Sequence, residues 1–319
     1  MARSAPTKSA NTTLTTLTTA RLLLLLYKVT GQENIARPRR LLREQLKTHP
    51  RTSEGGFWHK QIYPSQMWLD GLYMGEPFYA EYAATFHEDA AFDDIARQFV
   101  LMELHSRDAK TGLLYHAWDE SRKQRWSNPT TGRSPNFWGR AMGWYAMALV
   151  DTLDYFPAGP SATRRADPDS RNDWQTQCKR YQDPKSGLWY EVLDQGSRKG
   201  NYLEASVSCM FVYALAKGVR KDYLGRSISC RWLRKDTEAL SNASSRLNRA
   251  DKVNLEGTVS VGGLGGNPYR DGSYEYYLSE KIVTNDPKGV GAFLMASNEM
   301  EILAGLGSLP RLPRGAARR

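Results

Sequence analysis

Four long apolar segments dominate the pattern of hydrophobic and polar positions along the chain. They run over Gln66 to Phe86, Asn136 to Phe156, Asn201 to Val219, and Val290 to Leu306. Each segment is longer than a typical strand, so the pattern predicts four helices. In the first segment the apolar residues cover much of the helical surface and are not confined to one stripe, which is typical of a helix buried on several sides.

More amphipathic segments lie between the buried ones. Ile95 to Leu104 has charged residues between its apolar positions, and Asn34 to Thr48 is another candidate outer helix. A glycine followed by apolar or aromatic residues recurs at Gly56, Gly112, Gly187 and Gly272. A repeat of inner and outer helices every 55 to 85 residues, roughly, indicates a toroid of helical hairpins. The predicted fold class is therefore all-α, an α/α toroid of the six-hairpin barrel type.

The predicted helices are too few for a closed barrel. With the Leu-rich segment near Leu22 the pattern gives about nine helices, whereas six hairpins need about twelve. We expect an irregular or altered N-terminal segment over residues 1–20, an incomplete α/α barrel over residues 21–306, and a basic tail over residues 307–319. Ala158 to Asp173 and Gly225 to Arg249 interrupt the periodicity and predict loops or degraded helices.

Charge and cysteine content narrow the classes of function. The 319 residues carry a formal net charge of +10 at pH 7, but no zinc-finger spacing or basic recognition helix accompanies it, so we expect no nucleic-acid partner. The wide spacing of Cys178, Cys209 and Cys230 predicts reduced, buried thiols. The apolar run Leu22 to Tyr27 is too short to span a membrane, and no secretion signal is evident. The expected location is the cytoplasm, with no membrane partner.

Asp70 is the leading candidate for catalysis. Ser65 follows a proline and predicts a helix start that places Asp70 in the first turn or two, beside Trp68. Burial would raise the pKa of Asp70, whereas the positive end of its helix would lower it, and the balance decides between an acid and a base. The alternative is that Asp70 only caps its own helix.

A second cluster, Ser134 to Trp144, also begins with a cap residue and a proline. Arg140 and Trp144 are four residues apart and would share one helix face. A guanidinium beside a ring can bind a sugar that carries a carboxylate. Alternatively, Arg140 bonds only to an acidic neighbour, and Trp138 and Trp144 are core residues. His116 follows the second glycine phrase, where a structural role is the usual one.

Several motifs carry a family resemblance. They are Ser53-Glu54-Gly55-Gly56-Phe57-Trp58-His59-Lys60, Gln66-Met67-Trp68-Leu69-Asp70-Gly71-Leu72-Tyr73-Met74, and the stretches Gly112 to Glu120, Ser134 to Asp151, Ser186 to Lys217 and Gly257 to Glu301. Over roughly Leu22 to Glu301 the chain resembles the unsaturated rhamnogalacturonyl hydrolases of glycoside hydrolase family 105. The resemblance implies a six-hairpin α/α barrel that acts on Δ4,5-unsaturated galacturonic acid joined to rhamnose, with no metal or cofactor.

The resemblance also implies roles for particular residues. Matched by motif, Asp70 is the catalytic acid and base, and His116, Trp138, Arg140 and Trp144 line the sugar subsites. The implied chemistry is hydration of the C4=C5 enol ether. Asp70 protonates C4, water adds at C5, and the resulting hemiketal opens and expels rhamnose.

The chain departs from the family at its N-terminal part. Family members carry about three more helices before Leu22, and alignment puts Thr15 at the place of their second active-site aspartate. The resemblance therefore implies weak or no activity for the chain as given. A non-catalytic sugar-binding remnant of the same fold is the alternative, and a nucleic-acid binder driven by net charge is a third hypothesis.

Overall fold

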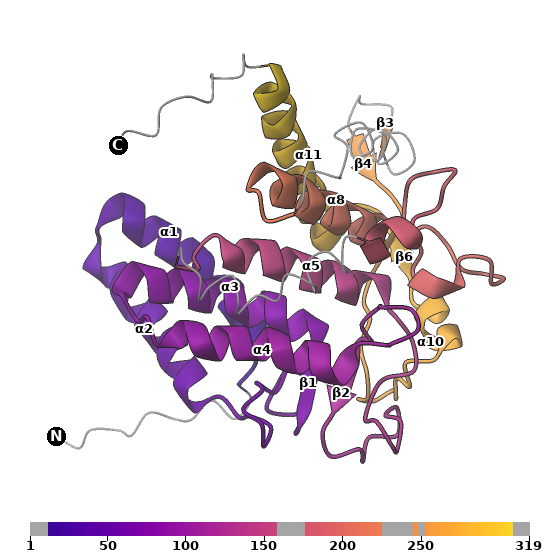
Figure 1. Cartoon of the computed structure of the whole chain (residues 1–319), viewed down its shortest axis with the longest axis horizontal. Helices are drawn as coiled ribbons and strands as arrows, with labels where there is room; N and C mark the ends of the chain where they lie inside the picture. Colours follow the sequence, from indigo (N-terminus) through magenta and orange to yellow (C-terminus); the bar gives the residue numbers. More distant parts are fainter. Residues whose placement is uncertain (1–11, 158–175, 225–244, 248–252, 309–319) are drawn as a thin grey trace, which may run out of the picture.

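The computed structural model describes residues 12–157, 176–224, 245–247 and 253–308, and this part of the chain is mostly helical (Figure 1). The helices are α1 Ala20–Thr30, α2 Glu33–Thr48, α3 Leu69–Phe86, α4 Ala91–Ser106, α5 Gly139–Leu153, α8 Ala205–Arg220, α10 Tyr274–Ser279 and α11 Pro287–Ser308, with 3₁₀ turns η1 Leu14–Leu17 and η2 Leu193–Gln195. The strands are β1 Gln66–Trp68, β2 Ala117–Asp119, β3 Ser245–Leu247, β4 Val253–Leu255, β5 Thr258–Val259 and β6 Ile282–Val283. They form separate antiparallel pairs, β1 with β2, β3 with β4 and β5 with β6.

The long helices follow one another around an arc. α1 contacts α3, α3 contacts α5, α5 contacts α8, and α8 contacts α11. α2 packs on α1, and α4 packs on α3, so these two helices form the second layer of the arc (Figure 1). From α1 to α5, inner helices alternate with outer ones, and the helical arrangement confirms the predicted α/α toroid. The absence of further N-terminal helices stays a prediction.

All four predicted buried segments contain a helix, but two of the predicted helix starts are wrong. Gln66–Trp68 is strand β1, which pairs with Ala117–Asp119, so α3 begins at Leu69 with Trp68 at its N-cap. Ser65, the predicted cap, has a φ of 61°. In α5 the N-cap is Trp138. A strand precedes α3, and Trp138 before α5 forms a bridge with Val192, and a cap-plus-proline pattern reveals neither pairing.

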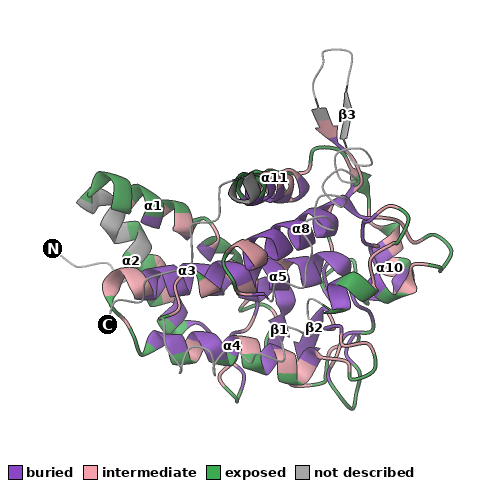
Figure 2. Cartoon of the chain, turned by 45° about the horizontal axis from the view of Figure 1, so that its top comes forward, coloured by how far each residue is buried: buried purple, intermediate pink, exposed green. Residues whose placement is uncertain are grey.

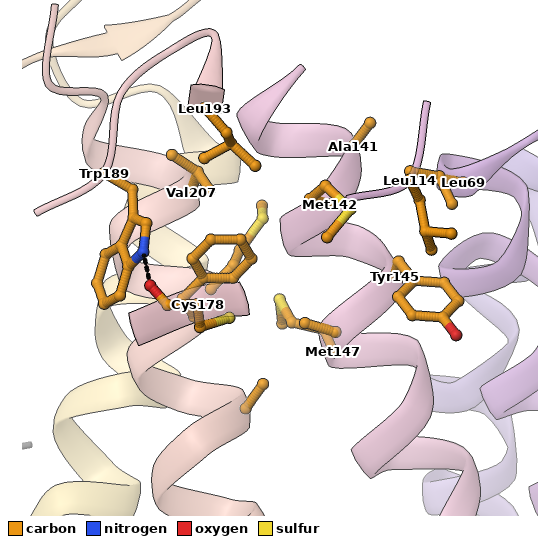
Figure 3. Close-up of a cluster of buried hydrophobic side chains, with 14 of the residues drawn as sticks. Leu69, Leu114, Ala141, Met142, Tyr145, Met147, Cys178, Trp189, Leu193 and Val207 are labelled. Carbon is orange, nitrogen blue, oxygen red and sulfur yellow. Dashed lines mark hydrogen bonds between the residues drawn. The ribbon is translucent and has the colours of Figure 1, made fainter. Parts of the chain in front are cut away.

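The core lies between α5 and α8 and extends to their neighbours. Met142 and Met147 of α5 face Val207 of α8 and the Trp189 indole, whose Nε1 donates to the carbonyl oxygen of Cys178 over 2.7 Å (Figure 3). Gly143 lies at the contact between the two helices, where a Cβ atom would be 2.7 Å from the Met210 sulfur. The glycine therefore allows α5 and α8 to approach closely.

Burial is uneven around the arc. α5 and α8 are covered on most sides, whereas α1 exposes much of its surface (Figure 2). Its exposed side chains include Leu22, Leu25, Leu26 and Val29, spaced as one helix face. No helix within the described ranges is long and apolar enough to cross a membrane.

Other expectations fall partly outside the described residues. Residues 158–173, most of Gly225 to Arg249, the first eleven residues and most of the basic tail lie there. The part of Gly225 to Arg249 that is described is β3, which pairs with β4. Cys178 and Cys209 are free, buried thiols, as predicted, and Cys230 lies outside the described residues. The predicted outer helices correspond to α2 and α4.

Candidate active site

A cleft of about 230 Å³ opens at the ends of α3 and α5 where these helices begin. Asp70 is the second residue of α3, and Arg140 is the second residue of α5. Both line the cleft together with Trp138 and Trp144. The two helix starts therefore bring four of the five sequence-predicted site residues to one cavity.

His116, the fifth, is held directly behind Asp70. The pairing of β1 with β2 continues by one bond, in which the Leu69 backbone N–H donates to the carbonyl oxygen of His116 over 3.1 Å. This places the imidazole beside the first turn of α3, with Nε2 3.1 Å from Oδ2 of Asp70. The His116 side chain is fully buried, so it reaches the cleft only through Asp70.

A tyrosine fixes the orientation of this histidine. Nδ1 of His116 is 2.8 Å from the hydroxyl of Tyr277 in α10. Burial raises the pKa of Tyr277 well above its usual range, so the phenol keeps its proton. Nδ1 of His116 is thus engaged by the Tyr277 hydroxyl, and the other ring nitrogen, Nε2, points at Oδ2 of Asp70. No sequence pattern linked Tyr277 to Asp70, because the two are far apart along the chain.

Opposing effects act on the pKa of Asp70. Burial raises it, but the hydrogen bond and charge of His116, a smaller effect of His59 and a backbone N–H together hold the pKa below its usual value. Position in the first turn of α3 acts in the same direction. The free cleft therefore contains Asp70 as a carboxylate, which answers the question of balance that the sequence left open.

Arg140 is a buried cation whose guanidinium group is only partly hydrogen-bonded. Its Nη1 donates to the Val259 carbonyl oxygen, and its guanidinium carbon lies 5.0 Å from the Trp138 ring. Nε of Arg140 has no hydrogen-bond partner, and within the described ranges no carboxylate lies within the 4.0 Å of an ion pair. The alternative in which Arg140 bonds only to an acidic neighbour therefore does not describe this structure.

Trp138 is hydrogen-bonded to a buried glutamate, Glu191. Its indole Nε1 donates to Oε1 of Glu191 over 2.7 Å. Burial and the nearby Glu204 raise the pKa of Glu191 well above its usual value, although Arg140 acts in the opposite direction. The raised pKa of Glu191 weakens this group as a counter-ion for Arg140. Trp138 itself is almost fully buried, so it forms the floor of the cleft, whereas the half-buried Trp144 stacks on Tyr73 with ring centroids 4.6 Å apart.

Three stacked rings form a further part of the cleft lining that no sequence pattern assigned to the site. His59 and Tyr63 lie against the Trp68 indole, with centroids 4.6 and 5.1 Å away and ring planes inclined by 12° and 7°. All three rings line the cleft. Burial lowers the pKa of His59 to about 3, so this imidazole is neutral. The signal was present in the motif that ends in His59 and Lys60, but spacing alone does not show that this loop folds back onto the start of α3.

Thr15 also lines the cleft, from the 3₁₀ turn η1. Among the described cleft residues Asp70 is the only carboxylate, and the basic ones are Lys60, Arg140, Arg270 and Lys288. The part of the chain that the structure describes contains no group of three His, Cys, Asp or Glu side chains placed to hold a metal ion. The cleft as built is cationic and aromatic around one carboxylate, which suits an anionic sugar.

Comparison with known proteins adds an independent line of support. The model of Glycosyl Hydrolase Family 88 matches residues 2–304. Protein Atu3128 of Agrobacterium fabrum is 41% identical over 236 residues, which cover 72% of this chain and 100% of that protein. The unsaturated rhamnogalacturonyl hydrolase YesR of Bacillus subtilis is 32% identical over 199 residues, covering 60% of this chain and 54% of YesR. A solved glycoside hydrolase from family 105 of C. acetobutylicum is 48% identical, with a TM-score of 0.88 over 91% of this chain and 80% of its own.

These similarities agree with the motifs and with the toroid of helices. The resemblance to the unsaturated rhamnogalacturonyl hydrolases of family 105 is confirmed by the neighbouring structure and by YesR. The family match extends over nearly the whole described chain and includes every residue of the cleft. The chain belongs to glycosyl hydrolase family 88 and is a glycoside hydrolase.

Proposed function

We propose that this protein hydrolyses unsaturated rhamnogalacturonan disaccharides by hydrating the C4=C5 bond of the unsaturated galacturonic acid, with release of rhamnose. The observation that carries the proposal is the pair formed by Asp70 and His116 at a cleft that the buried Arg140 also lines. YesR, at 32% identity, is named for this activity. The proposal needs no metal or cofactor, because protonation and hydration are within reach of a carboxylate.

In this proposal the sugar carboxylate binds at Arg140. Its guanidinium has an unbonded Nε and no carboxylate partner among the residues described. Trp138 and Trp144 would pack on the apolar faces of the sugar rings, and His116 would orient Asp70. The start of α5 thus supplies the residues that recognise the sugar, and the start of α3 supplies the catalytic Asp70.

In the proposed mechanism Asp70 first takes up a proton and then donates it to the substrate. In the free cleft the pKa of Asp70 lies below its usual value, so the resting group is ionised. A bound uronate excludes water and brings a second negative charge to the cleft, and both effects raise the pKa of a neighbouring carboxyl group. Asp70 takes up its proton as substrate binds and then acts as the acid.

The bonds balance without any further reactant. The proton of Asp70 goes to C4, the oxygen of one water bonds to C5, and a proton of that water returns to the Asp70 carboxylate. The product is a hemiketal at C5. It opens by breaking the bond between C5 and the ring oxygen, which leaves a hemiacetal at C1 that expels rhamnose. The rule that relates carboxylate separation to stereochemistry does not apply to this route.

A second candidate is a sugar-binding remnant without turnover, and one feature favours it. Thr15, which the resemblance puts at the position of a second carboxylate, lines the cleft, and Asp70 is the only carboxylate among the described cleft residues. A threonine cannot hold a proton near Asp70 by like-charge coupling. We therefore propose that activity in this chain is weak, with the binding determinants retained.

The cytoplasm is the proposed compartment. Cys178 and Cys209 are free and buried, and burial raises the pKa of both thiols. Buried, protonated thiols are stable in a reducing environment, where disulfides are rare. The proposal places the reaction after import of the unsaturated fragment, and cell fractionation with an antibody against the chain tests it.

Loss of the enol-ether absorbance of the unsaturated disaccharide measures the reaction. We expect the wild-type chain to hydrate it slowly and Asp70→Asn to lose about a hundredfold or more, which is the usual size of a general acid–base contribution. Asparagine still accepts the hydrogen bond from His116, so the fold is kept. Asp89→Asn, on the surface, is the matched control. Equal rates for Asp70→Asn and wild type refute the role of Asp70.

Calorimetry with the same disaccharide separates the two candidates. Heat of binding without turnover supports the remnant, and turnover that depends on Asp70 supports the enzyme. Absence of heat at millimolar ligand removes both. Binding that disappears in Arg140→Met but persists in Asp70→Asn would support the assignment of the carboxylate seat to Arg140.

A further inference from the structure

Two cations meet at one aromatic ring, Tyr63, in the lining of the cleft. Nζ of Lys60 lies 5.6 Å from the centroid of the Tyr63 ring, and Nη2 of Arg270 donates to the Tyr63 hydroxyl over 3.3 Å. All three residues line the cleft. Lys60 and Tyr63 come from the loop before α3, and Arg270 comes from a loop that is more than two hundred residues away in the sequence but adjacent in space.

Neither cation has a counter-ion among the residues that the structure describes. No carboxylate lies within 4.0 Å of Lys60 or Arg270. The other lysine of the cleft differs in this respect, because Nζ of Lys288 is 2.8 Å from Asp286. Two like charges that converge without an acidic partner repel each other, and an anion that enters between them relieves that repulsion.

Hydrogen bonds fix the orientation of the Arg270 guanidinium before any anion binds. Its Nε donates to the carbonyl oxygen of Gly265 over 2.9 Å, and Tyr63 takes one bond from Nη2. Among the residues that the structure describes, two of the five guanidinium N–H groups have a partner. Gly263 leaves room beside the guanidinium, since a Cβ atom there would be 2.5 Å from Nη1. Fixing the fork in advance lowers the entropy lost when it binds a carboxylate.

This pair of cations is separate from Arg140 but borders the same cleft. Gly262 lies against Trp138, where a Cβ atom would be 2.3 Å from the indole, and the next residue, Gly263, lies against Arg270. Gly262 therefore lies close to Trp138, whose ring centroid is 5.0 Å from the Arg140 guanidinium carbon. The next residue, Gly263, lies close to the Arg270 guanidinium. Because both cationic positions line one cleft, we expect a ligand that crosses it to contact both.

We propose that Lys60 and Arg270 form a second anion-binding position, which takes a carboxylate on the leaving-group side of the scissile bond. The proposal rests on the function proposed above and refines its substrate class. The preferred substrate is an acidic oligosaccharide with two uronic acids, the unsaturated one at Arg140 and a second at Lys60 and Arg270. A disaccharide with a neutral leaving sugar leaves the second position empty.

Three ligands with one linkage test the proposal. They are the unsaturated disaccharide, the trisaccharide that extends it by one uronic acid, and the methyl ester of that added uronic acid. The Kd by calorimetry and the KM are measured for wild type, Lys60→Gln and Arg270→Gln. The surface variant Lys110→Gln is the control, because Lys110 is exposed and lies outside the cleft.

We expect wild type to bind the acidic trisaccharide about tenfold more tightly than its methyl ester, the lower end of the contribution of one charge-assisted hydrogen bond. Lys60→Gln and Arg270→Gln each reduce this ratio to about threefold or less, and Lys110→Gln keeps it. Raising the salt concentration also reduces it in wild type.

Two outcomes overturn the inference, and they differ from failure of the proposed function. Equal affinity of wild type for acid and ester, or a ratio that survives in both variants, refutes the second position while binding of the disaccharide stands. If none of the three ligands gives heat or turnover, the proposed function fails and the inference fails with it. The ratio of affinities for the acidic trisaccharide and its methyl ester is measured by binding alone, so the test also applies to a chain with little catalytic activity.

Discussion

Acidification should destabilise this protein through one buried histidine. The pKa of His59 falls from 6.5 to about 3 because the ring is buried, while the Asp70 charge acts weakly in the other direction. Its Nδ1 has no hydrogen-bond partner in the structure. Below pH 6.5 the unfolded chain binds a proton at this position and the folded chain does not. Folding stability therefore falls as the pH drops from 6.5 towards about 3, and His59 contributes nothing to the pH dependence above that window.

The size of the effect follows from the linkage relation. Each pH unit within the window costs about 1.4 kcal/mol for one proton. At pH 4.5, two units below the unfolded pKa, the loss is about 2.7 kcal/mol, a large part of a stability of about 5 to 15 kcal/mol. The assay is urea denaturation followed by tryptophan fluorescence at half-unit steps from pH 7.5 to 4.5.

Comparison with a variant isolates the histidine from the carboxylates that titrate in the same range. His59→Gln removes the titrating ring, so its curve of stability against pH should be flatter than that of wild type by about 1.4 kcal/mol per unit below pH 6.5. Loss of stacking on Trp68 shifts the curve by a constant and leaves its slope. His87→Asn, at an exposed helix end with a φ of 57°, should follow wild type. Parallel curves for wild type and His59→Gln refute the reasoning.

Two further predictions concern the contacts between inner helices. Asp151→Ala should reduce the free energy of unfolding by about 3 kcal/mol in urea titrations, because it removes a fully buried carboxylate 2.6 Å from the buried amine of Lys217; a loss below 1 kcal/mol would contradict this. Gly143→Ala should cost about 1 to 2 kcal/mol by thermal unfolding, since the new Cβ would lie 2.9 Å from Met210 Cβ. Gly75→Ala, whose Cβ would meet only Leu14 methyls at 3.5 and 4.0 Å, should be neutral or stabilising, and equal losses in both variants would show that packing is not the cause.

The sequence predicted the toroid because its inner helices are buried on most sides. A segment such as α8 Ala205–Arg220 carries apolar residues around its whole circumference, and only a helix surrounded by others tolerates that. Helix starts were predicted less well, since Gln66–Trp68 satisfies its backbone in a ladder with Ala117–Asp119. A ladder between segments fifty residues apart leaves no local signal, whereas a serine after a proline gives a strong but false one.

The sequence named Asp70 and Arg140 from motifs close to two expected helix starts. In the structure each is the second residue of a buried helix and lines the cleft, and their roles stay predictions. Tyr277, Lys60 and Arg270 could not be assigned from periodicity, because they reach the cleft from loops and a short helix whose positions depend on long-range contacts. Loop residues of this kind often carry function, but their partners are set by tertiary structure.

Charged side chains are paired near the C-terminal ends of the inner helices and incompletely paired near their N-terminal ends. The paired charges contribute to stability, whereas the cleft lies at the N-terminal ends. Toward the helix ends, Glu81, Asp151 and Lys217 are paired with cations or anions, including the 2.7 Å contact from Arg21 to Asp151. Paired ions in that layer hold α1, α3, α5 and α8 together. At the helix starts, Arg140 keeps an unbonded Nε. A buried cation that is incompletely bonded adds little to the stability of a fold, and this feature of Arg140 supports the proposal that the cleft binds an anionic sugar.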